Sequence, residues 1–478
     1  MAVSRPSNTP MPSSFAGFGL PRPLVEALTA AGITTPFPIQ ADTLPDSLAG
    51  RDVLGRGRTG SGKTYAFLLP LVTRLAQSSS KRRTGAPRAL ILAPTRELAR
   101  QIEESLAPLA KAMSMRTMTV FGGVPANPQI RSLRGGVDIV IACPGRLEDL
   151  MRSGHADLGS VEITVIDEAD HMADLGFLPV VRRLLDKTPA RGQRLLFSAT
   201  LDGGVDVLVK RFLTNPVVHS VDSEQSPVST MDHHVLHVDT AARLPIIADL
   251  AAAPGRTVVF TRTKFGAKAL ARKLNAAGVP AVELHGNLSQ NARSRNLSSF
   301  SSGETPTLVA TDIAARGIHV DDVALVIHAD PPVEHKAYLH RSGRTARAGA
   351  SGTVVTMMLD AQVHDVRDLT RRAGIRPTIT RVSVGHSLLT SIAPGERSYT
   401  APRPTVSEPA GQGSSGRGRN RARTAPAGSA RGGRGRGTGT AARGSRGTGR
   451  PGKPATKTLG SGGEHSAASF SSSARGRR

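Results

Sequence analysis

At 478 residues, the chain is long enough for two or three domains of ordinary size. Its formal net charge is +25, of which the stretch from Ala401 onward carries +14, so that the first 400 residues still carry +11. An excess of this size favours a polyanionic partner, either nucleic acid or an anionic membrane surface.

A membrane partner is not expected. No apolar run approaches the ~20 residues of a membrane span, and the N-terminus lacks the charged and apolar regions of a signal peptide. The single cysteine, Cys143, excludes an intramolecular disulfide and a zinc site built on cysteines. We therefore expect a soluble protein in a reducing compartment, the cytoplasm.

The first informative motif lies between an apolar strand at residues 53–54 and a predicted helix at 65–75. Its sequence fits the phosphate-binding loop pattern, in the strand–loop–helix order which that pattern requires. Its glycines let backbone N–H groups face an anion, and the following helix N-terminus adds partial positive charge. Lys63 is placed for the terminal phosphates, and the Thr64 hydroxyl for Mg²⁺. The residues expected to bind a nucleoside triphosphate are Gly57, Arg58, Thr59, Gly60, Ser61, Gly62, Lys63 and Thr64.

Apolar, β-branched runs alternate with stretches of helical spacing along most of the chain. The first series predicts strands at 89–93, 137–142, 163–166 and 194–197, with helices that include 97–113 and 175–185. The second series predicts strands at 257–260, 281–284, 307–310, 323–327 and 353–358, with helices that include 265–276 and 290–300. This alternation predicts two α/β domains, each with a parallel sheet that helices cover on both faces.

The expected boundaries follow from where these signals begin and fade. They are a disordered N-terminus at 1–14, a first domain at 15–221, a linker at 222–233, a second domain at 234–384 and a disordered tail at 385–478. The tail is rich in Gly, Arg and Ser and has too few large apolar residues to form a core. Its Arg-Gly repeats favour RNA binding over a purely solubilising role, because guanidinium stacks on bases and forks onto phosphates.

Two adjacent carboxylates follow the apolar run at 163–166. We expect Asp167 to hold Mg²⁺ and Glu168 to act as the general base that polarises the attacking water. An acidic helix start has a similar composition. The position of the pair between the phosphate-binding loop and Ser198-Ala199-Thr200, at another strand end, favours the catalytic interpretation.

Hydrolysis also needs positive charge on the departing phosphate. Arg344 and Arg347 are three residues apart, so that on a helical turn they would share a face and could act as arginine fingers. A solvated basic helix start is the alternative, and it would be preferred if the segment stood alone. The expected catalytic set is Lys63, Asp167, Glu168, Arg344 and Arg347.

In their order, these motifs resemble those of the DEAD-box ATP-dependent RNA helicases of superfamily 2, of the bacterial type with an Arg/Gly-rich C-terminal tail. The similarity covers about residues 15–384. It implies two tandem RecA-like domains, ATP and Mg²⁺ as cofactors, and RNA held by backbone contacts without sequence preference. It also implies a monomeric helicase core, with ribosome-assembly or RNA-decay complexes as candidate partners.

The resemblance assigns roles to further residues. The segment from Gly32 to Gln40 resembles the Q motif, in which the Gln40 amide and an upstream aromatic, here Phe15, would read adenine. Coupling of hydrolysis to strand separation is implied for Ser198, Thr200, Asp312 and His340. RNA contacts are implied for Pro94, Thr95, Arg96, Gly122, Gly123, Pro144, Gly145, Arg146, Gln290, Arg293 and Thr311.

The chain departs from the family pattern at four places. Gly57-Arg58 stands where Ala-Gln is common, which leaves the Gly-Lys-Thr of the loop intact. Cys143 stands where the family usually has Thr before Pro-Gly-Arg, and a thiol is a poorer hydrogen-bond donor than a hydroxyl. His319 stands where Asp is general, a residue expected to touch the ATP ribose. Ala346 replaces a frequent Gly without an expected cost to the two arginines.

The expected function is an RNA-stimulated ATPase that opens short RNA duplexes locally or remodels RNA–protein complexes. Binding of ATP and RNA would close the two domains on each other and bring Arg344 and Arg347 to the γ-phosphate. The alternatives are a DNA helicase of the same superfamily and a non-hydrolysing RNA chaperone or clamp. RNA-specific stimulation of turnover separates all three.

Overall fold

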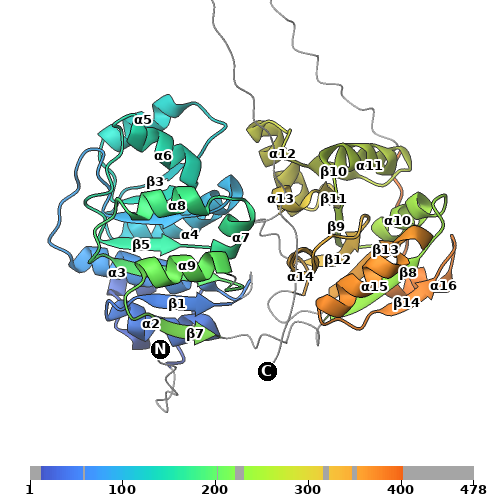
Figure 1. Cartoon of the computed structure of the whole chain (residues 1–478), viewed down its shortest axis with the longest axis horizontal. Coiled ribbons are helices and arrows are strands. Elements are labelled where there is room, and N and C mark those ends of the chain that lie inside the picture. Colours follow the sequence, from blue (N-terminus) through green and yellow to red (C-terminus); the bar gives the residue numbers. More distant parts are fainter. Residues whose placement is uncertain are drawn as a thin grey trace, which may run out of the picture. The chain divides into compact units, whose positions relative to one another are not determined.

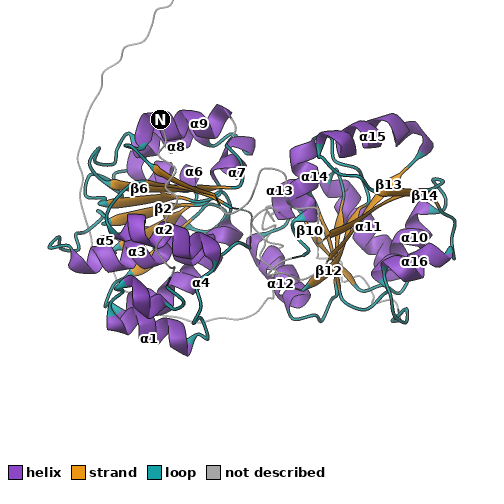
Figure 2. Ribbon diagram, turned by 90° about the horizontal axis from the view of Figure 1, so that it is seen from below, coloured by secondary structure: helices purple, strands orange, loops and turns teal. Residues whose placement is uncertain are grey.

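The computed structural model describes residues 12–57, 60–201, 203–220, 231–315, 322–346 and 352–401. Within these residues it contains two seven-stranded sheets, in which all the named strands pair in parallel, with helices on both faces of each (Figures 1 and 2). The predicted fold class of two tandem α/β domains is therefore confirmed. No helix in this described part of the chain is long and apolar enough to cross a membrane.

The first domain has the strand order β3-β4-β2-β5-β6-β1-β7. Its strands are β1 (Val53–Arg56), β2 (Ala89–Leu92), β3 (Thr117–Val120), β4 (Ile139–Ala142), β5 (Ile163–Ile166), β6 (Gln193–Ser198) and β7 (Val217–Ser220). Its helices are η1 (Phe15–Phe18), α1 (Arg22–Ala30), α2 (Pro38–Leu48), α3 (Lys63–Gln77), α4 (Arg96–Ala112), α5 (Ala126–Arg134), α6 (Pro144–Arg152), α7 (Ala169–Asp174), α8 (Leu178–Leu185) and α9 (Gly203–Phe212).

The second domain has the strand order β10-β11-β9-β12-β13-β8-β14. Its strands are β8 (Met231–His237), β9 (Arg256–Phe260), β10 (Ala281–Leu284), β11 (Thr307–Ala310), β12 (Val323–His328), β13 (Gly352–Met358) and β14 (Thr378–Arg381). Its helices are α10 (Arg243–Ala251), α11 (Lys264–Ala276), α12 (Gln290–Ser301), α13 (Asp312–Ala315), α14 (His335–Ser342), η3 (Asp360–Gln362), α15 (Val363–Arg372) and α16 (Ser387–Ile392).

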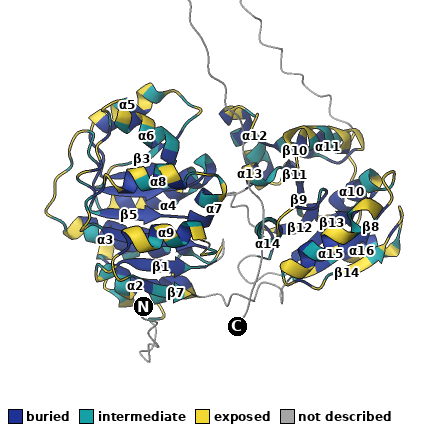
Figure 3. Ribbon diagram, viewed as in Figure 1, coloured by how far each residue is buried: buried dark blue, intermediate teal, exposed yellow. Residues whose placement is uncertain are grey.

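Successive residues of a strand point to opposite sides of the sheet, and helices cover both sides, so that both faces of each sheet are buried. In β2, Ile91 packs in the core formed with α3 and α4, whereas Leu90 and Leu92 pack in the core formed with α6 to α9. In β9, Val259 packs with α10, α11 and α16, whereas Val258 packs on the opposite face. The strands are accordingly buried along most of their length (Figure 3).

Three expectations about elements are wrong. Residues 231–233 belong to strand β8 and not to the linker, and β8 was missed because its three histidines and Asp232 read as polar. The stretch 175–185 is not one helix, because Gly176 adopts a left-handed backbone with φ of 72° between α7 and α8. The tail cannot begin at 385, since α16 buries Leu389 and Ile392 in the second domain.

Several predicted features lie outside the described residues. They are the first eleven residues, most of the linker, the Arg/Gly-rich segment beyond residue 401, and the residues Arg58, Thr59, His319 and Arg347.

A buried polar cluster in the second domain predicts that the protein loses stability in acid. His233 Nδ1 lies 3.0 Å from the Tyr338 hydroxyl, and His328 Nδ1 lies 3.1 Å from Thr356 Oγ1. Burial lowers the pKa of His233 to about 4 and lowers the pKa of His328 well below its usual value, where the charge of Arg341 acts in the same direction. Both rings are thus neutral in the folded protein and take up protons more readily when it unfolds.

The contribution of these two histidines to the free energy of unfolding should therefore be constant above pH 6.5 and fall as the pH drops from 6.5 towards 4. Each histidine should contribute about 1.4 kcal/mol per pH unit. Asp167, whose pKa is raised, acts in the opposite sense over this range, so that the test compares variants. In thermal unfolding of the whole chain, His328→Asn should weaken the fall in stability, whereas His364→Asn, at an exposed ring, should leave it unchanged. An equal pH dependence in His328→Asn and in the unaltered protein would contradict the expectation.

Candidate functional site

The carboxyl ends of the strands in the first sheet gather the predicted site residues along one edge. The phosphate-binding loop follows β1, Asp167 and Glu168 follow β5, and Ser198 ends β6; these three strands are neighbours in the order β5-β6-β1. Pro94, Gly122 and Pro144 follow β2, β3 and β4, which form the adjoining half of the same sheet. Open parallel sheets bind ligands at this edge. The nucleotide motifs therefore occupy one half of it and the predicted RNA motifs the other.

The phosphate-binding loop holds its lysine against its own backbone. Lys63 begins α3, is 7% exposed, and donates from Nζ to the Gly57 carbonyl over 2.5 Å. Ser61 Oγ is buried and has no hydrogen-bond partner in the described part of the chain. Backbone N–H groups at the start of α3 and an unsatisfied hydroxyl favour an anionic ligand that can take their hydrogen bonds.

The Q motif is bonded directly to this loop. Gln40 donates from Nε2 to the Gly62 carbonyl over 2.8 Å and accepts from the Phe37 backbone N–H through Oε1, also over 2.8 Å. Gly62 has a φ of +91°, and a Cβ there would lie 2.7 Å from Gln40 Nε2, so that only glycine fits. Phe37 is 45% exposed beside the loop, whereas Phe15 is 2% exposed in the core. Stacking of Phe15 on adenine therefore stays a prediction, and Phe37 is an aromatic to which the sequence analysis gave no role.

The two carboxylates after β5 are buried and differ in their surroundings. Asp167 is 3% exposed and accepts from the Glu168 N–H through Oδ1 over 2.9 Å. Burial, followed by the negative charge of Glu168, raises the pKa of Asp167 to about 7. Burial also acts to raise the pKa of Glu168, but other effects outweigh it and lower this pKa below its usual range. They are the contact of Glu168 Oε2 with His171 Nδ1 at 3.1 Å and the positive charges of Lys63 and Arg344. Glu168 is thus held as a carboxylate, as a general base requires.

Asp170 ties the carboxylate motif to β6. Its N–H donates to Ser198 Oγ over 3.2 Å, and its Oδ2 accepts from the Thr200 N–H over 2.9 Å and from the Thr200 hydroxyl over 3.2 Å. Ser198 Oγ donates in turn to the Thr200 carbonyl. A change at the carboxylates is therefore transmitted to Ser198 and Thr200 through hydrogen bonds, which suits their predicted coupling role. The sequence analysis gave no role to Asp170 or to His171.

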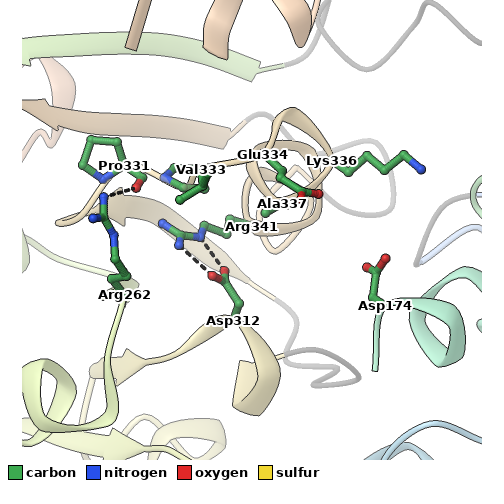
Figure 4. Close-up of a pocket in the computed structure, with 10 residues that line it drawn as sticks. Asp174, Arg262, Asp312, Pro331, Val333, Glu334, Lys336, Ala337 and Arg341 are labelled. Atoms are coloured by element: carbon green, nitrogen blue, oxygen red, sulfur yellow. Dashed lines mark hydrogen bonds and ion pairs between the residues drawn. The ribbon is translucent and has the colours of Figure 1, made fainter. Parts of the chain in front are cut away.

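In the second domain, Asp312 pairs with an arginine of α14. Arg341 forks onto the carboxylate, with Nε–Oδ1 at 2.5 Å and Nη2–Oδ2 at 2.8 Å, and its guanidinium lies 5.2 Å from the centre of the Phe260 ring (Figure 4). A buried, bidentate pair of this kind fixes geometry as well as charge. It holds the start of α13 against α14, the helix that carries His340 and leads to Arg344.

The shared helical turn of Arg344 and Arg347 stays a prediction, because Arg347 lies outside the described residues. Helix α14 ends at Ser342, before Arg344, and Ala346 adopts a left-handed φ of 53°. Arg344 is 8% exposed, donates from Nε to the His340 carbonyl over 3.3 Å, and contributes charge at Glu168. The assignment of Arg344 to the catalytic site therefore rests on the effect of its charge at Glu168 and not on helical spacing.

Local contacts fix the positions of several predicted RNA-binding residues of the first domain. Thr95 caps α4 by accepting from the Leu98 N–H over 3.2 Å, and Arg146 donates to the Val124 carbonyl over 3.1 Å. Gly123 has a φ of +75°, and a Cβ there would collide with the Arg96 guanidinium. The glycine is thus needed both for the turn and for the place of Arg96.

Gln290 and Arg293 contact the first domain's predicted RNA motif. Arg96 donates to Gln290 Oε1 over 2.9 Å, and Glu97 Oε1 accepts from Arg293 Nε over 2.8 Å. Burial acts to raise the pKa of Glu97, and the charge and hydrogen bond of Arg293 lower it, with a net lowering. Glu97 is therefore a partner of Arg293 that the sequence analysis did not single out. Thr311 follows β11 and donates its N–H to the Leu284 carbonyl over 3.2 Å.

Comparison with known proteins identifies the family. The model of the DEAD/DEAH box helicases matches residues 37–207, and the model of the helicase conserved C-terminal domain matches residues 240–349. The chain is 38% identical to DEAD-box ATP-dependent RNA helicase 20 of Arabidopsis thaliana over 382 residues, which are 78% of this chain and 76% of that protein. The chain belongs to the DEAD-box ATP-dependent RNA helicases.

Other relatives of this DEAD-box protein are longer than the matched region. The chain is 38% identical to the mitochondrial DEAD-box ATP-dependent RNA helicase 9 of A. thaliana, with 76% of this chain and 60% of the relative covered. It thus spans less than two thirds of that protein. Both relatives are from a plant, so the bacterial type stays a prediction.

A solved structure confirms the RecA-like architecture of the DEAD-box fold. The structure of S. cerevisiae Dbp5 bound to RNA and ADP BeF3 has a TM-score of 0.70 and 28% sequence identity, and covers 80% of this chain and 100% of the Dbp5 chain. That complex contains a nucleotide and RNA on the same protein.

Cys143 differs from the usual DEAD-box threonine at a helix N-cap. It precedes Pro144 in α6 and makes no side-chain capping bond, and burial raises the pKa of its thiol to about 12. Cys143→Thr should therefore stabilise the fold by about 1 kcal/mol, because a hydroxyl can accept from an exposed N–H of the first turn. RNA affinity should rise with it. Cys143→Val is the matched control without a hydroxyl, and equal melting temperatures for the two variants would contradict the capping argument.

Ala346 replaces the usual DEAD-box glycine where the backbone is left-handed. A residue with a Cβ is strained by ~1 kcal/mol in this conformation. Ala346→Gly should therefore raise the melting temperature by a few degrees in thermal unfolding. Ala346→Ser, which keeps a Cβ, should not. A lower melting temperature for Ala346→Gly would show that the strain is not relieved.

Proposed function

We propose that the protein is an RNA-stimulated ATPase that couples ATP binding and hydrolysis to local unwinding of RNA duplexes or remodelling of RNA–protein complexes. The observation that carries the proposal is the electrostatic setting of Glu168. Its carboxylate is buried, lies 3.1 Å from His171, and is influenced by Lys63 of the first domain and Arg344 of the second. The general base thus lies within the electrostatic influence of both cations that would hold a phosphate.

The chain's own residues supply most of the mechanism. Lys63 exchanges the Gly57 carbonyl for phosphate oxygens. The second N–H and the second lone pair of the Gln40 amide read the edge of adenine, which favours ATP. Glu168 takes a proton from the attacking water, and Arg344 stabilises charge on the departing phosphate. Arg347 is proposed for the same role.

Mg²⁺ fits the same edge of the first sheet. The donors available are the Asp167 carboxylate, which is 3% exposed, and the Thr64 hydroxyl. Both are oxygen ligands of the kind that Mg²⁺ prefers. No cluster of three or more His, Cys, Asp or Glu suited to a metal occurs in the described residues. Mg²⁺ in nucleotide sites is held by one or two carboxylates and the substrate phosphates, so this donor set is sufficient. When bound, it would neutralise charge on the phosphates.

The proximity of the two halves of the site supports coupling between RNA and ATP. The Asp167 N–H donates to the Leu92 carbonyl over 3.0 Å, two residues before Pro94 in the predicted RNA motif. RNA contacts at Pro94 to Arg96 can therefore bias the position of the catalytic carboxylates, and ATP can bias the RNA contacts reciprocally. Binding to the RNA backbone would proceed without sequence preference.

The remaining parts of the proposal concern the cellular setting. We place the protein in the cytoplasm, with a monomeric helicase core and with ribosome-assembly or RNA-decay complexes as candidate partners. The Arg/Gly-rich tail would bind RNA and raise its effective concentration at the core. Deletion from Ala401 should lower RNA affinity and flatten its salt dependence.

ATP turnover measured with RNA and with DNA of the same sequence tests the proposal. RNA should stimulate the full-length protein and DNA should not. Equal stimulation by both would favour a DNA helicase of the same superfamily. Tight, ATP-dependent RNA binding without turnover would favour a non-hydrolysing clamp.

A further inference from the structure

Helix α11 of the second domain has an unusual outer face. Its thirteen residues, from Lys264 to Ala276, include four basic residues and no acidic one. Ala267, Ala271 and Leu274 are buried against the sheet, whereas Phe265, Lys268 and Arg272 are exposed. Because these three are spaced by three and four residues, they share one face of the helix. We refer to Phe265, Lys268 and Arg272 as the outer face of α11 (Figures 1 and 3).

Phe265 is exposed in a chain that has few aromatic residues. The sequence contains 12 Phe, 3 Tyr and no Trp, and the Phe265 side chain is 70% exposed. Lys264 Nζ lies 5.4 Å from the centre of its ring and donates to Asn287 Oδ1 over 3.0 Å. The ring thus has a cation over one face and is exposed over most of its surface. An exposed aromatic with an adjacent cation is the arrangement by which proteins stack an unpaired nucleic-acid base.

The electrostatics of the helix also favour an anionic ligand. A lysine in the first turn of a helix is unfavourable because its charge opposes the helix dipole. Lys264 occupies the first position of α11, and the helix has no acidic residue to offset it. Solvated helices usually carry both signs of charge. A phosphate partner would relieve this imbalance.

The place of Phe265 in the sheet connects it to the predicted RNA contacts. Phe260, Ala310 and Leu284 are level with one another at the carboxyl ends of β9, β11 and β10. The bond from Lys264 to Asn287 joins the segment after β9 to the segment after β10, on either side of the end of β11. Thr311, a predicted RNA contact, is the residue that follows β11. Phe265 therefore lies beside the RNA-binding edge of this domain.

The other end of α11 lies where the described chain ends. The Thr400 N–H donates to the Gly278 carbonyl over 2.8 Å, two residues beyond the end of α11. At 1.5 Å per residue, the helix is about 20 Å long. Its outer face thus extends from the strand ends towards the point at which the Arg/Gly-rich segment of the sequence begins.

We propose that the outer face of α11 is a binding surface for single-stranded RNA, on which Phe265 stacks on a base and Lys268 and Arg272 contact phosphates. The proposal rests on the proposed function, because it extends the path of the same RNA strand beyond Thr311. This surface would add a contact with an RNA base to an interaction that is otherwise made with the RNA backbone. Stacking is tolerant of sequence, so the added contact does not require a specific base.

Binding of a fluorescent oligouridylate to the full-length protein, measured over a range of salt, tests this surface. Phe265→Ala should weaken binding about 10-fold without changing the salt slope, because stacking releases no counterions. Phe265→Trp should retain the affinity. The double variant Lys268→Ala with Arg272→Ala should reduce the salt slope by about 1.4, since each phosphate contact with a single strand contributes ~0.7.

Controls and crosslinking separate this surface from a general loss of RNA binding. Ile379→Ala removes an exposed apolar side chain of the edge strand β14 in the same domain and should leave binding unchanged. Ultraviolet crosslinking should map to the peptide with Phe265. Unchanged affinity in Phe265→Ala together with an unchanged slope in the double variant would overturn the inference and leave the proposed function intact. The expected losses of binding in a protein whose turnover RNA does not stimulate would support the surface and contradict the proposed function.

Discussion

Glu168→Gln should reduce RNA-stimulated ATP turnover by about 10²–10⁴-fold, the usual contribution of a positioned general base. The amide matches the carboxylate in shape and can still approach His171, from which Glu168 Oε2 lies 3.1 Å. It cannot accept a proton from water. The affinity for ATP should therefore be nearly unchanged, and steady-state turnover with nucleotide binding measured separately distinguishes the two effects.

A matched control for Glu168→Gln is a carboxylate outside the site. Glu304→Gln changes the same groups in an exposed loop of the second domain and should leave turnover unaltered. Turnover at the wild-type rate in Glu168→Gln would exclude Glu168 as the base.

Arg344→Ala should reduce turnover by about 10³-fold, at the lower end of the effect of an arginine finger. The residue is 8% exposed and its charge acts at Glu168 in the other domain. Its contribution arises when charge develops on the departing phosphate, so kcat should fall much more than ATP affinity. Single-turnover hydrolysis with saturating RNA and ATP measures this step directly.

Arg344→Lys keeps the charge but loses the fork of donors, and it should recover only part of the rate. Arg376→Ala, at an exposed arginine after α15, is the control for a change in net charge alone. If Arg344→Ala weakened RNA binding and left single-turnover hydrolysis unchanged, the residue would belong to the RNA interface and not to the catalytic site.

The sequence predicted the parts of the fold that are built from apolar, β-branched residues. Buried strands such as β5 and β11 were located correctly because every position in them faces a core. Strand β8 was missed since His233 and His234 read as polar, although His233 is buried in a hydrogen-bonded network. Edge strand β14 was missed for the opposite reason, because three of its four residues are exposed and carry no burial pattern.

The sequence predicted the site residues through their motifs, but not the partners that orient them. Asp170 lies three residues after Asp167, yet nothing in the sequence places its carboxylate on the Thr200 N–H. The pairing of Glu97 with Arg293 joins residues 196 apart, and such long-range contacts cannot be derived from local spacing. The left-handed Ala346 was also unexpected, since alanine rarely adopts that backbone.

The double attachment of Gln40 has a consequence for how the protein selects its nucleotide. Both polar ends of this amide are already engaged, one with Phe37 and the other with the phosphate-binding loop at Gly62. Each end keeps a second hydrogen-bonding position, one N–H on Nε2 and one lone pair on Oε1, and the two existing bonds fix the directions in which these point. A base that offers one acceptor and one donor in the matching order can pair with them without any rearrangement of the amide, whereas a base with the opposite pattern leaves both positions unsatisfied. Selectivity for adenine then arises from an amide that is oriented before the nucleotide binds, and a triphosphate without a base can occupy the loop without disturbing Gln40.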